Sequence, residues 1–241
     1  MAEDRAYVPQ RMVHRHRNVA GGWARAAVFG VSDGLVSNVA LILGVAGAST
    51  SAPLVRVAGI SGLLAGAFSM AAGEYVSVKA QNELIEREVE IERRSIAEKP
   101  EAETNELAAI YEQRGVGAAQ ARRLAVAIMA DPDIALDVHT REELGVAPDA
   151  LGSPVTAAGA SIAGFALGAF VPLVPWFFGG GTAAVVATLV AGLLAAALVG
   201  ALIAHYTERS IVRTALRQVV VAAISCGVTF GIGRALGSQV G

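Results

Sequence analysis

The chain has 241 residues, of which 54% are hydrophobic and 17% are charged, and its mean hydropathy is +0.53. Soluble domains carry about 25% charged residues, so this composition excludes an ordinary soluble domain and favours a membrane protein. The formal net charge of -2 hides a segregation, because ten glutamates lie between Glu83 and Glu112 whereas residues 152–241 contain one acid, Glu208. The single cysteine, Cys226, excludes an intrachain disulfide.

Residues 1–23 are polar and basic, without the apolar core or cleavage site of a signal peptide, and we expect a cytosolic tail. The apolar run 24–48 follows and is long enough to span a membrane. Asp33 lies in the middle of this run, and nothing nearby in sequence neutralises it. A carboxylate inside a span costs roughly 2.5–3.5 kcal/mol, which makes it a functional-site candidate. The alternative is a buried aspartate that is hydrogen-bonded to a neighbouring helix.

Four further apolar runs predict membrane helices. Ser153 and Pro154 open one of them, as an N-cap followed by proline at the first helical position. The sequence therefore predicts an all-α, five-span helical membrane protein. Spans one and two lie in 24–78, a polar cytosolic helical domain is inserted at 79–152, and spans three to five lie in 153–241. The expected spans after the first are 54–78, 154–178, 182–204 and 216–236.

The basic residues predict the orientation. Of the 19 Lys and Arg residues, 17 lie in the N-terminal region, in the insert or in the link between spans four and five. Only Arg56 and Arg234 fall on the other side. Because basic residues concentrate on the cytosolic side, we expect the N-terminus and the insert in the cytosol and the C-terminus outside.

Glycines spaced four apart recur in the spans, as at Gly30/Gly34 and Gly164/Gly168. This spacing lets helices approach closely, although glycine is common in membrane helices anyway. We expect tight helix packing and a homo-oligomer.

Met70 and Glu74 are spaced i, i+4 on the second span and share one face, with Glu74 near the cytosolic end. A thioether with the carboxylates of Glu74 and Asp33 would suit Fe(II) or another transition metal rather than Mg²⁺ or Ca²⁺. The alternatives are that Met70 is a packing residue of the core and that Glu74 is an interfacial carboxylate.

The insert reads as four helical segments rich in glutamate. The first, 79–95, continues the second span; the next begins at Pro100 and ends before Gly115; the third covers 118–129, and the last follows Asp131 and ends near Gly145. Glu103 and Glu106 lie on the same helical side as Leu107 and Ile110, where an acid is less expected than on the solvent side. The alternative is that acids in the first turn of a helix interact favourably with the helix dipole. Clustered glutamates bind cations only if they converge, and a solvated helix is the alternative.

Other chemical signatures are absent from the sequence. There is no CxxC pair, no HExxH motif and no Walker A motif, so any transport would be driven by gradients rather than by ATP. His139 and His205 appear isolated in the sequence, and His14 and His16 lie in the basic tail.

Three segments carry a resemblance to a known family: VFGVSDGLVSNVALILGVAGA, FSMAAGEYVSVKAQNELIEREV, and DPDIALDVHTREELGV followed by ALGAFVPLVP. They resemble the vacuolar iron transporter family, including its bacterial members, from about residue 14 to the C-terminus. The resemblance implies five spans, a homodimer, and export of ferrous iron and often manganese from the cytosol in exchange for protons. It also implies a cytosolic metal-binding domain on a long second helix.

The resemblance assigns metal-site residues by motif. Asp33 and Met70 match the metal path in the membrane, and Glu74 follows in the same motif. The matches in the metal-binding domain are Glu92, Glu103, Glu106 and Met129, and Asp133 is a further candidate ligand at a position of the same domain. This chain departs from relatives at Ser95 and Asp133, where glutamate is expected, and at Ala130, where some have methionine.

The leading hypothesis is a divalent metal/proton antiporter that needs no resident cofactor and binds its metal transiently. Its expected partners are metal ions, protons, the bilayer and a second copy, without nucleic acid. We expect a multi-pass protein of a prokaryotic plasma membrane. The alternatives are a membrane-bound di-iron oxidase, which needs Glu-x-x-His pairs that this sequence lacks, and a metal sensor without transport.

Overall fold

The computed structural model describes residues 22–143, 145 and 151–240. All regular elements in that part of the chain are helices. In chain order they are α1 (Gly22–Ala48), α2 (Ala52–Glu98), α3 (Pro100–Gln113), α4 (Ala118–Met129), α5 (Pro132–Glu143), α6 (Pro154–Phe170), the 3-10 helix η1 (Val171–Leu173), α7 (Pro175–Phe178), α8 (Gly181–Thr207) and α9 (Ile211–Val240).

In the described part of the chain, five helical segments are long and apolar enough to cross a membrane, which confirms the predicted span number. The third span differs from the expected single helix over 154–178. It continues from α6 only to the end of η1, and α7 is a separate helix. The cause is two prolines, Pro172 and Pro175, which lack the amide hydrogen that an unbroken helix needs.

The membrane half is built around α1, which packs against α6 and α9. The glycine pairs of α1 and α6 make the first contact close: a Cβ on Gly30 would lie 2.7 Å from the carbonyl oxygen of Ser161, and one on Gly34 would collide with Phe165. Gly227 and Gly231 of α9, by contrast, have nothing within 4 Å of such a Cβ. The GxxxG spacing therefore marks internal packing on α1 and α6, whereas at Gly227/Gly231 of α9 it marks open surface.

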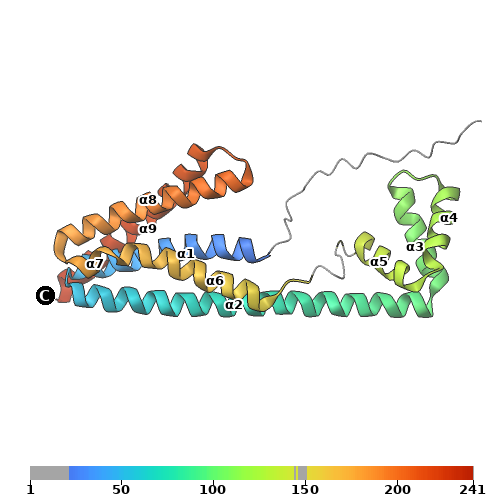
Figure 1. The fold of residues 1–241 in the computed structure, drawn as a ribbon, viewed down its shortest axis with the longest axis horizontal. Coiled ribbons are helices and arrows are strands. Elements are labelled where there is room, and N and C mark those ends of the chain that lie inside the picture. The colour runs from blue at the N-terminus through green and yellow to red at the C-terminus, as the bar shows by residue number, and fades with distance from the viewer. Residues whose placement is uncertain (1–21, 144, 146–150, 241) are drawn as a thin grey trace, which may run out of the picture.

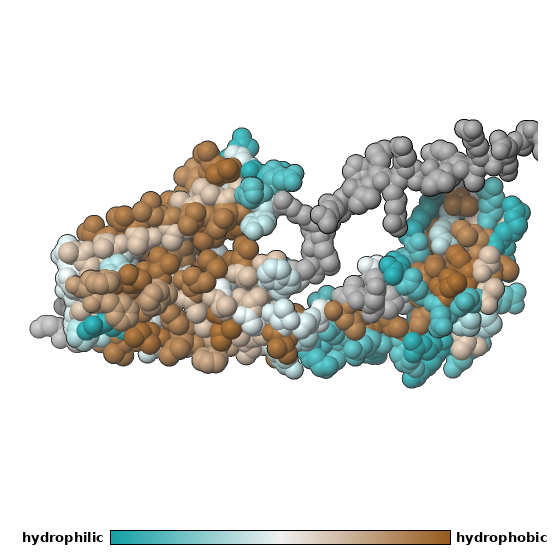
Figure 2. Space-filling model, in the orientation of Figure 1, coloured by the Kyte–Doolittle hydropathy of each residue, from teal (hydrophilic) through white to brown (hydrophobic). Residues whose placement is uncertain are grey.

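The helix α2 is 47 residues long and joins the two halves of the molecule (Figure 1). Its first part lies in the apolar half, and its far end carries the bundle of α3, α4 and α5, which we call the insert bundle. Figure 2 shows the contrast between a largely hydrophobic half and an insert bundle in which hydrophilic residues surround a smaller hydrophobic area. The start of α1, the insert bundle and the turn between α8 and α9 lie toward one end of the membrane half, and the end of α9 lies at the other (Figure 1).

The insert bundle has a small core of its own. Leu107 and Ala108 of α3 pack with Ala125 of α4, and Val138 of α5 packs against them. This core fixes α3 against α4, while α5 contacts α2. The arrangement places the acidic side chains of α2, α3 and α5 around one point.

Candidate metal centre

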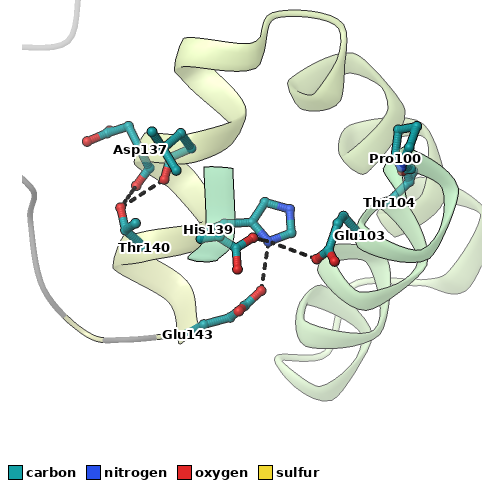
Figure 3. A network of polar contacts seen from close by, with 9 residues as sticks. Pro100, Glu103, Thr104, Asp137, His139, Thr140 and Glu143 are labelled. Carbon is teal, nitrogen blue, oxygen red and sulfur yellow. Dashed lines mark hydrogen bonds and ion pairs between the residues drawn. The ribbon is translucent and has the colours of Figure 1, made fainter. Parts of the chain in front are cut away.

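Four side chains from three helices converge in the insert bundle. Glu92 comes from α2, Glu103 from α3, and His139 and Glu143 from α5. One potential ligand atom from each lies within 4.8 Å of all the others. Figure 3 shows Glu103, His139 and Glu143 pointing toward one another. We call these four residues the insert cluster.

Helix starts and helical spacing explain this convergence. Pro100 begins α3 directly after α2 ends, so that Glu103 and Leu107 lie together on its buried side. The Asp131 carboxylate accepts hydrogen bonds from the amides of Asp133 and Ile134 and so caps α5. His139 and Glu143 are four residues apart on α5 and therefore share a face.

The insert cluster has more acceptors than donors. His139 Nδ1 lies 2.7 Å from Glu143 Oε1, 3.1 Å from Glu92 Oε1 and 3.9 Å from Glu103 Oε2. The imidazole is fully buried, and Nδ1 can carry only one hydrogen. Glu92 Oε1 and His139 Nε2 are buried without a hydrogen-bond partner. Several carboxylates that meet at one ring nitrogen are arranged as cation ligands, because a cation would satisfy all of them.

The electrostatics of the cluster agree with this reading. Burial, followed by repulsion from Glu143, raises the pKa of Glu92 from its ordinary value of 4.5 to about 7. Burial, followed by repulsion from Glu106, also raises the pKa of Glu103. Glu92 therefore holds its proton up to a pH near neutral, and a divalent cation would compete with that proton for the same carboxylate.

The structure brings together only some of the residues predicted for this domain. Glu92 and Glu103 lie in the insert cluster, whereas Glu106 is exposed beside it and acts on both through its charge. The exposed Asp133 in the first turn of α5 is not among the four, and Met129 ends α4, a helix that contributes none of the four. Their role as ligands remains a prediction.

The expectation that His139 is isolated is wrong. Sequence reasoning also missed Glu143, although a signal was present: Ala135, His139 and Glu143 follow one another at intervals of four. This spacing places His139 and Glu143 on the side of α5 that carries the buried Ala135.

A second group of candidate ligands lies in the membrane half. An open cavity of about 380 Å³ between α1, α2 and α6 is lined by Asp33, Ser37 and Asn38 on one side and by Ser69 and Met70 on another. Asp33 and Ser37 are four residues apart on α1, as Gly66 and Met70 are on α2, so two helix faces oppose each other. The structure thus brings Asp33 and Met70 to one cavity, which we call the membrane cavity.

Glu74 does not line the membrane cavity but lies one turn beyond Met70. Its carboxylate forms an ion pair with Arg25 in the first turn of α1, at 3.1 Å. The Glu74 side chain is mostly buried, at 17% exposed, whereas that of Arg25 is 75% exposed. This pair links the first turn of α1 to α2, beside the end of the membrane cavity that carries Asp33 and Met70.

Comparisons with known proteins identify the family of this chain. The sequence profile of the VIT family matches residues 24–234. A protein named vacuolar iron transporter from Acanthamoeba castellanii is 37% identical over 162 residues, which are 66% of this chain and 58% of that protein. Vacuolar iron transporter 1 of Arabidopsis thaliana is 37% identical over 158 residues, or 65% and 63% of the two chains. Vacuolar iron transporter 1 of Eucalyptus grandis is 34% identical over 173 residues, or 70% and 69%.

The match to the first two relatives spans less than two thirds of their own length. The family profile, by contrast, covers nearly the whole of the described structure, from α1 through the insert bundle to α9. This multi-pass helical membrane protein therefore belongs to the VIT family.

Proposed function

We propose that the protein is a divalent metal/proton antiporter that moves Fe(II), and also Mn(II), out of the cytosol. The observation that carries the proposal is a pair of candidate metal sites on one chain, the insert cluster and the membrane cavity. The names of the relatives support iron as the cargo. The metal is cargo in this proposal, and no resident cofactor and no chemical conversion are required.

The insert cluster would capture metal. Three carboxylates and one imidazole offer oxygen and nitrogen ligands, which suit borderline divalent cations such as Fe(II). Because the ligands must be deprotonated before they bind, capture would release protons into the cytosol.

The membrane cavity would pass the metal across the bilayer. Asp33 supplies a charged oxygen and Met70 a soft sulfur, and Glu74 stands one turn nearer to the cytosolic end. Protonation of a ligating carboxylate removes its charge and weakens its hold on a cation. Proton uptake at Asp33 would therefore release the metal, which couples metal export to proton entry.

A homodimer is part of the proposal. Asp33 and Ser37 are exposed on the surface of the single chain at membrane depth, and the first part of α2 is little covered by other helices. A carboxylate that faced lipid tails would be costly. A second copy placed against α1 and α2 would shield Asp33 and enclose the path.

The orientation rests on the basic residues, which would hold the N-terminus and the insert bundle in the cytosol of a prokaryotic cell and the C-terminus outside its plasma membrane. Labelling from outside should then reach a cysteine introduced at Ser238 but not one at Gly117. Labelling of the Gly117 site in intact cells would overturn the orientation.

Two other functions fit less well. A di-iron oxidase of the ferritin-like type uses two Glu-x-x-His pairs, whereas the insert cluster has one histidine followed by a glutamate four residues later. A metal sensor without transport would not need Asp33 in a cavity at membrane depth.

Purified protein in liposomes tests the proposal. Uptake of Fe(II), Mn(II), Co(II) and Zn(II) should be measured with and without a pH gradient. We expect Fe(II) and Mn(II) uptake that accelerates when protons can flow the opposite way. Uptake equal to that of empty liposomes under every gradient would exclude transport, and uptake that ignores the gradient would exclude proton coupling.

A further inference from the structure

Asn38 is a buried polar side chain in the membrane cavity that the proposed function does not yet use. It lies on α1, five residues after Asp33, and only 2% of its surface is exposed. Five helical residues correspond to a rise of about 7.5 Å, so Asn38 lies deeper than Asp33, toward the end of α1 that joins α2.

The hydrogen bond of Asn38 fixes which way its amide points. Asn38 Nδ2 donates to the carbonyl oxygen of Ala169 on α6, at 2.6 Å. Since a backbone carbonyl can only accept, the nitrogen of the amide must face Ala169 and the oxygen must face away. Asn38 Oδ1 is buried and has no hydrogen-bond partner in the described structure.

The unpartnered oxygen faces a place where α2 has no side chain. A Cβ added to Gly62 would lie 3.0 Å from Asn38 Oδ1, and both residues line the membrane cavity. Gly62 is two turns from Met70, on the same face of α2. The oxygen and the bare backbone thus form the deep end of the cavity whose other end holds Asp33 and Met70.

We propose that Asn38 Oδ1 is a further ligand for the transported divalent cation and receives it from Asp33 and Met70 on the way to the far side. This inference rests on the proposed function. A buried carbonyl oxygen without a donor is costly, and a partly dehydrated cation would satisfy it. An amide oxygen carries no net charge, so it can replace a water ligand without holding the ion as tightly as a second carboxylate would.

A purely structural role is the competing explanation, since the bond to Ala169 also ties α1 to α6. The two roles differ in their effect on selectivity. Loss of an oxygen ligand leaves one carboxylate and one thioether, which disfavours Mn(II) more than Co(II) because Mn(II) depends more on oxygen ligands. Loss of packing alone would lower the flux of both ions by the same factor.

Two substitutions take the oxygen away from the cation by different routes, one by deleting it and one by covering it. Asn38→Leu deletes the amide at similar volume. Gly62→Ala keeps the hydrogen bond from Asn38 to Ala169 and places a methyl group against Asn38 Oδ1. The new methyl group would also meet the end of the Leu41 side chain, which is 39% exposed and can move. Thr188→Val is the matched control, because it breaks a buried hydrogen-bonded chain from Trp176 to Pro172 outside this cavity.

The measurement is Mn(II) and Co(II) flux into liposomes at limiting metal, expressed as a ratio. We expect Asn38→Leu and Gly62→Ala to lower the Mn(II)/Co(II) ratio by about tenfold, as is common when one group that supports a metal is lost. Thr188→Val should keep the wild-type ratio. If Asn38→Leu does not insert, Gly62→Ala decides alone.

The outcomes separate this inference from the function beneath it. A wild-type ratio in either folded variant would show that Asn38 is only structural, even though the protein transports metal. A lowered ratio in Thr188→Val as well would overturn the assignment to Asn38. If the wild-type protein moves neither ion, the proposed function is wrong and this inference falls with it.

Discussion

The two candidate metal sites of this chain differ in charge, burial and ligand type. The insert cluster gathers three carboxylates around a fully buried imidazole, whereas the membrane cavity offers one carboxylate, a thioether and an amide oxygen and opens to the surface. Dense negative charge favours tight binding of a metal cation from dilute solution, whereas a site with little charge favours release of the cation and its onward movement. The difference indicates that one chain separates the capture of a metal ion from its movement, and the predictions below test this separation.

The largest expected effect is at Asp33. Asp33→Asn keeps the shape of the side chain but removes its charge and its titrating proton. If Asp33 binds metal and exchanges protons, metal flux in liposomes should fall to the level of empty liposomes while the protein still inserts. Ser37→Ala serves as the control, because the Ser37 hydroxyl lines the same cavity but is already bonded to the backbone oxygen of Asp33. Wild-type flux in Asp33→Asn would reduce this aspartate to a structural polar group.

A smaller effect is expected in the insert cluster. Glu103→Gln or His139→Leu should raise the metal concentration for half-maximal transport by about 10- to 100-fold while much of the maximal rate remains, because these residues lie outside the bilayer path. Glu106→Gln should have a weaker effect, since Glu106 acts through its charge. Complete loss of flux at saturating metal in folded Glu103→Gln would contradict a capture role.

The ligand predictions from the family resemblance can be separated in the same assay. Met129→Leu and Asp133→Asn should leave the half-saturating concentration close to the wild-type value if the insert cluster is the capture site. A shift as large as that of Glu103→Gln would restore these two residues to the ligand set.

The pKa of Glu92 predicts a pH-dependent stability of the metal-free protein. The pKa is raised from 4.5 to about 7, so the folded chain holds this proton more tightly than the unfolded chain. The stabilisation of the folded state by protonated Glu92 is therefore fully present below about pH 4.5, and it is lost as the pH rises through about 7. Melting of the insert bundle in the full chain should occur at a lower temperature at about pH 8 than at about pH 5, and saturating metal should reverse this loss.

Glu92→Gln is the control for this titration, because an amide cannot ionise. Its melting temperature should depend less on pH between about 5 and 8 than that of the wild-type protein. An equal pH dependence in both proteins would mean that another group titrates.

The smallest effect is expected at Met70. Met70→Leu keeps the volume and removes only the sulfur, so Fe(II) flux should fall by about two- to fivefold, and Mn(II) flux by less. The measurement is the ratio of the two fluxes in liposomes. Equal losses for both metals would favour a packing role for Met70.

Much of the fold could be predicted from the sequence because its helices are punctuated by prolines and glycines. The predicted helix over 118–129 coincides with α4, and Pro100 and Pro132 mark the starts of α3 and α5 as expected. The continuation of the second span into the insert was also predicted, because no helix breaker occurs between Lys79 and Ser95. The third span ends earlier than predicted, because α6 stops at Phe170, just before Pro172.

The site could be predicted only where local sequence carried the signal. Asp33 stands out as the one acid in an apolar run, and Glu103 as an acid on the apolar side of a helix. The meeting of Glu92 with His139 depends on how α5 packs on α2, and the pairing of Arg25 with Glu74 joins residues 49 positions apart. Such contacts are set by tertiary packing, and no periodicity in the sequence reports them.

The most direct test of two separable sites is equilibrium binding of Mn(II) to the purified full-length chain, with free Mn(II) measured by electron paramagnetic resonance. The wild-type protein should show two classes of binding site, of which the tighter one disappears in Glu103→Gln and the weaker one in Asp33→Asn. If either substitution abolished both classes, or if Asp33→Asn removed the tighter one, capture and passage would not be divided between the insert cluster and the membrane cavity.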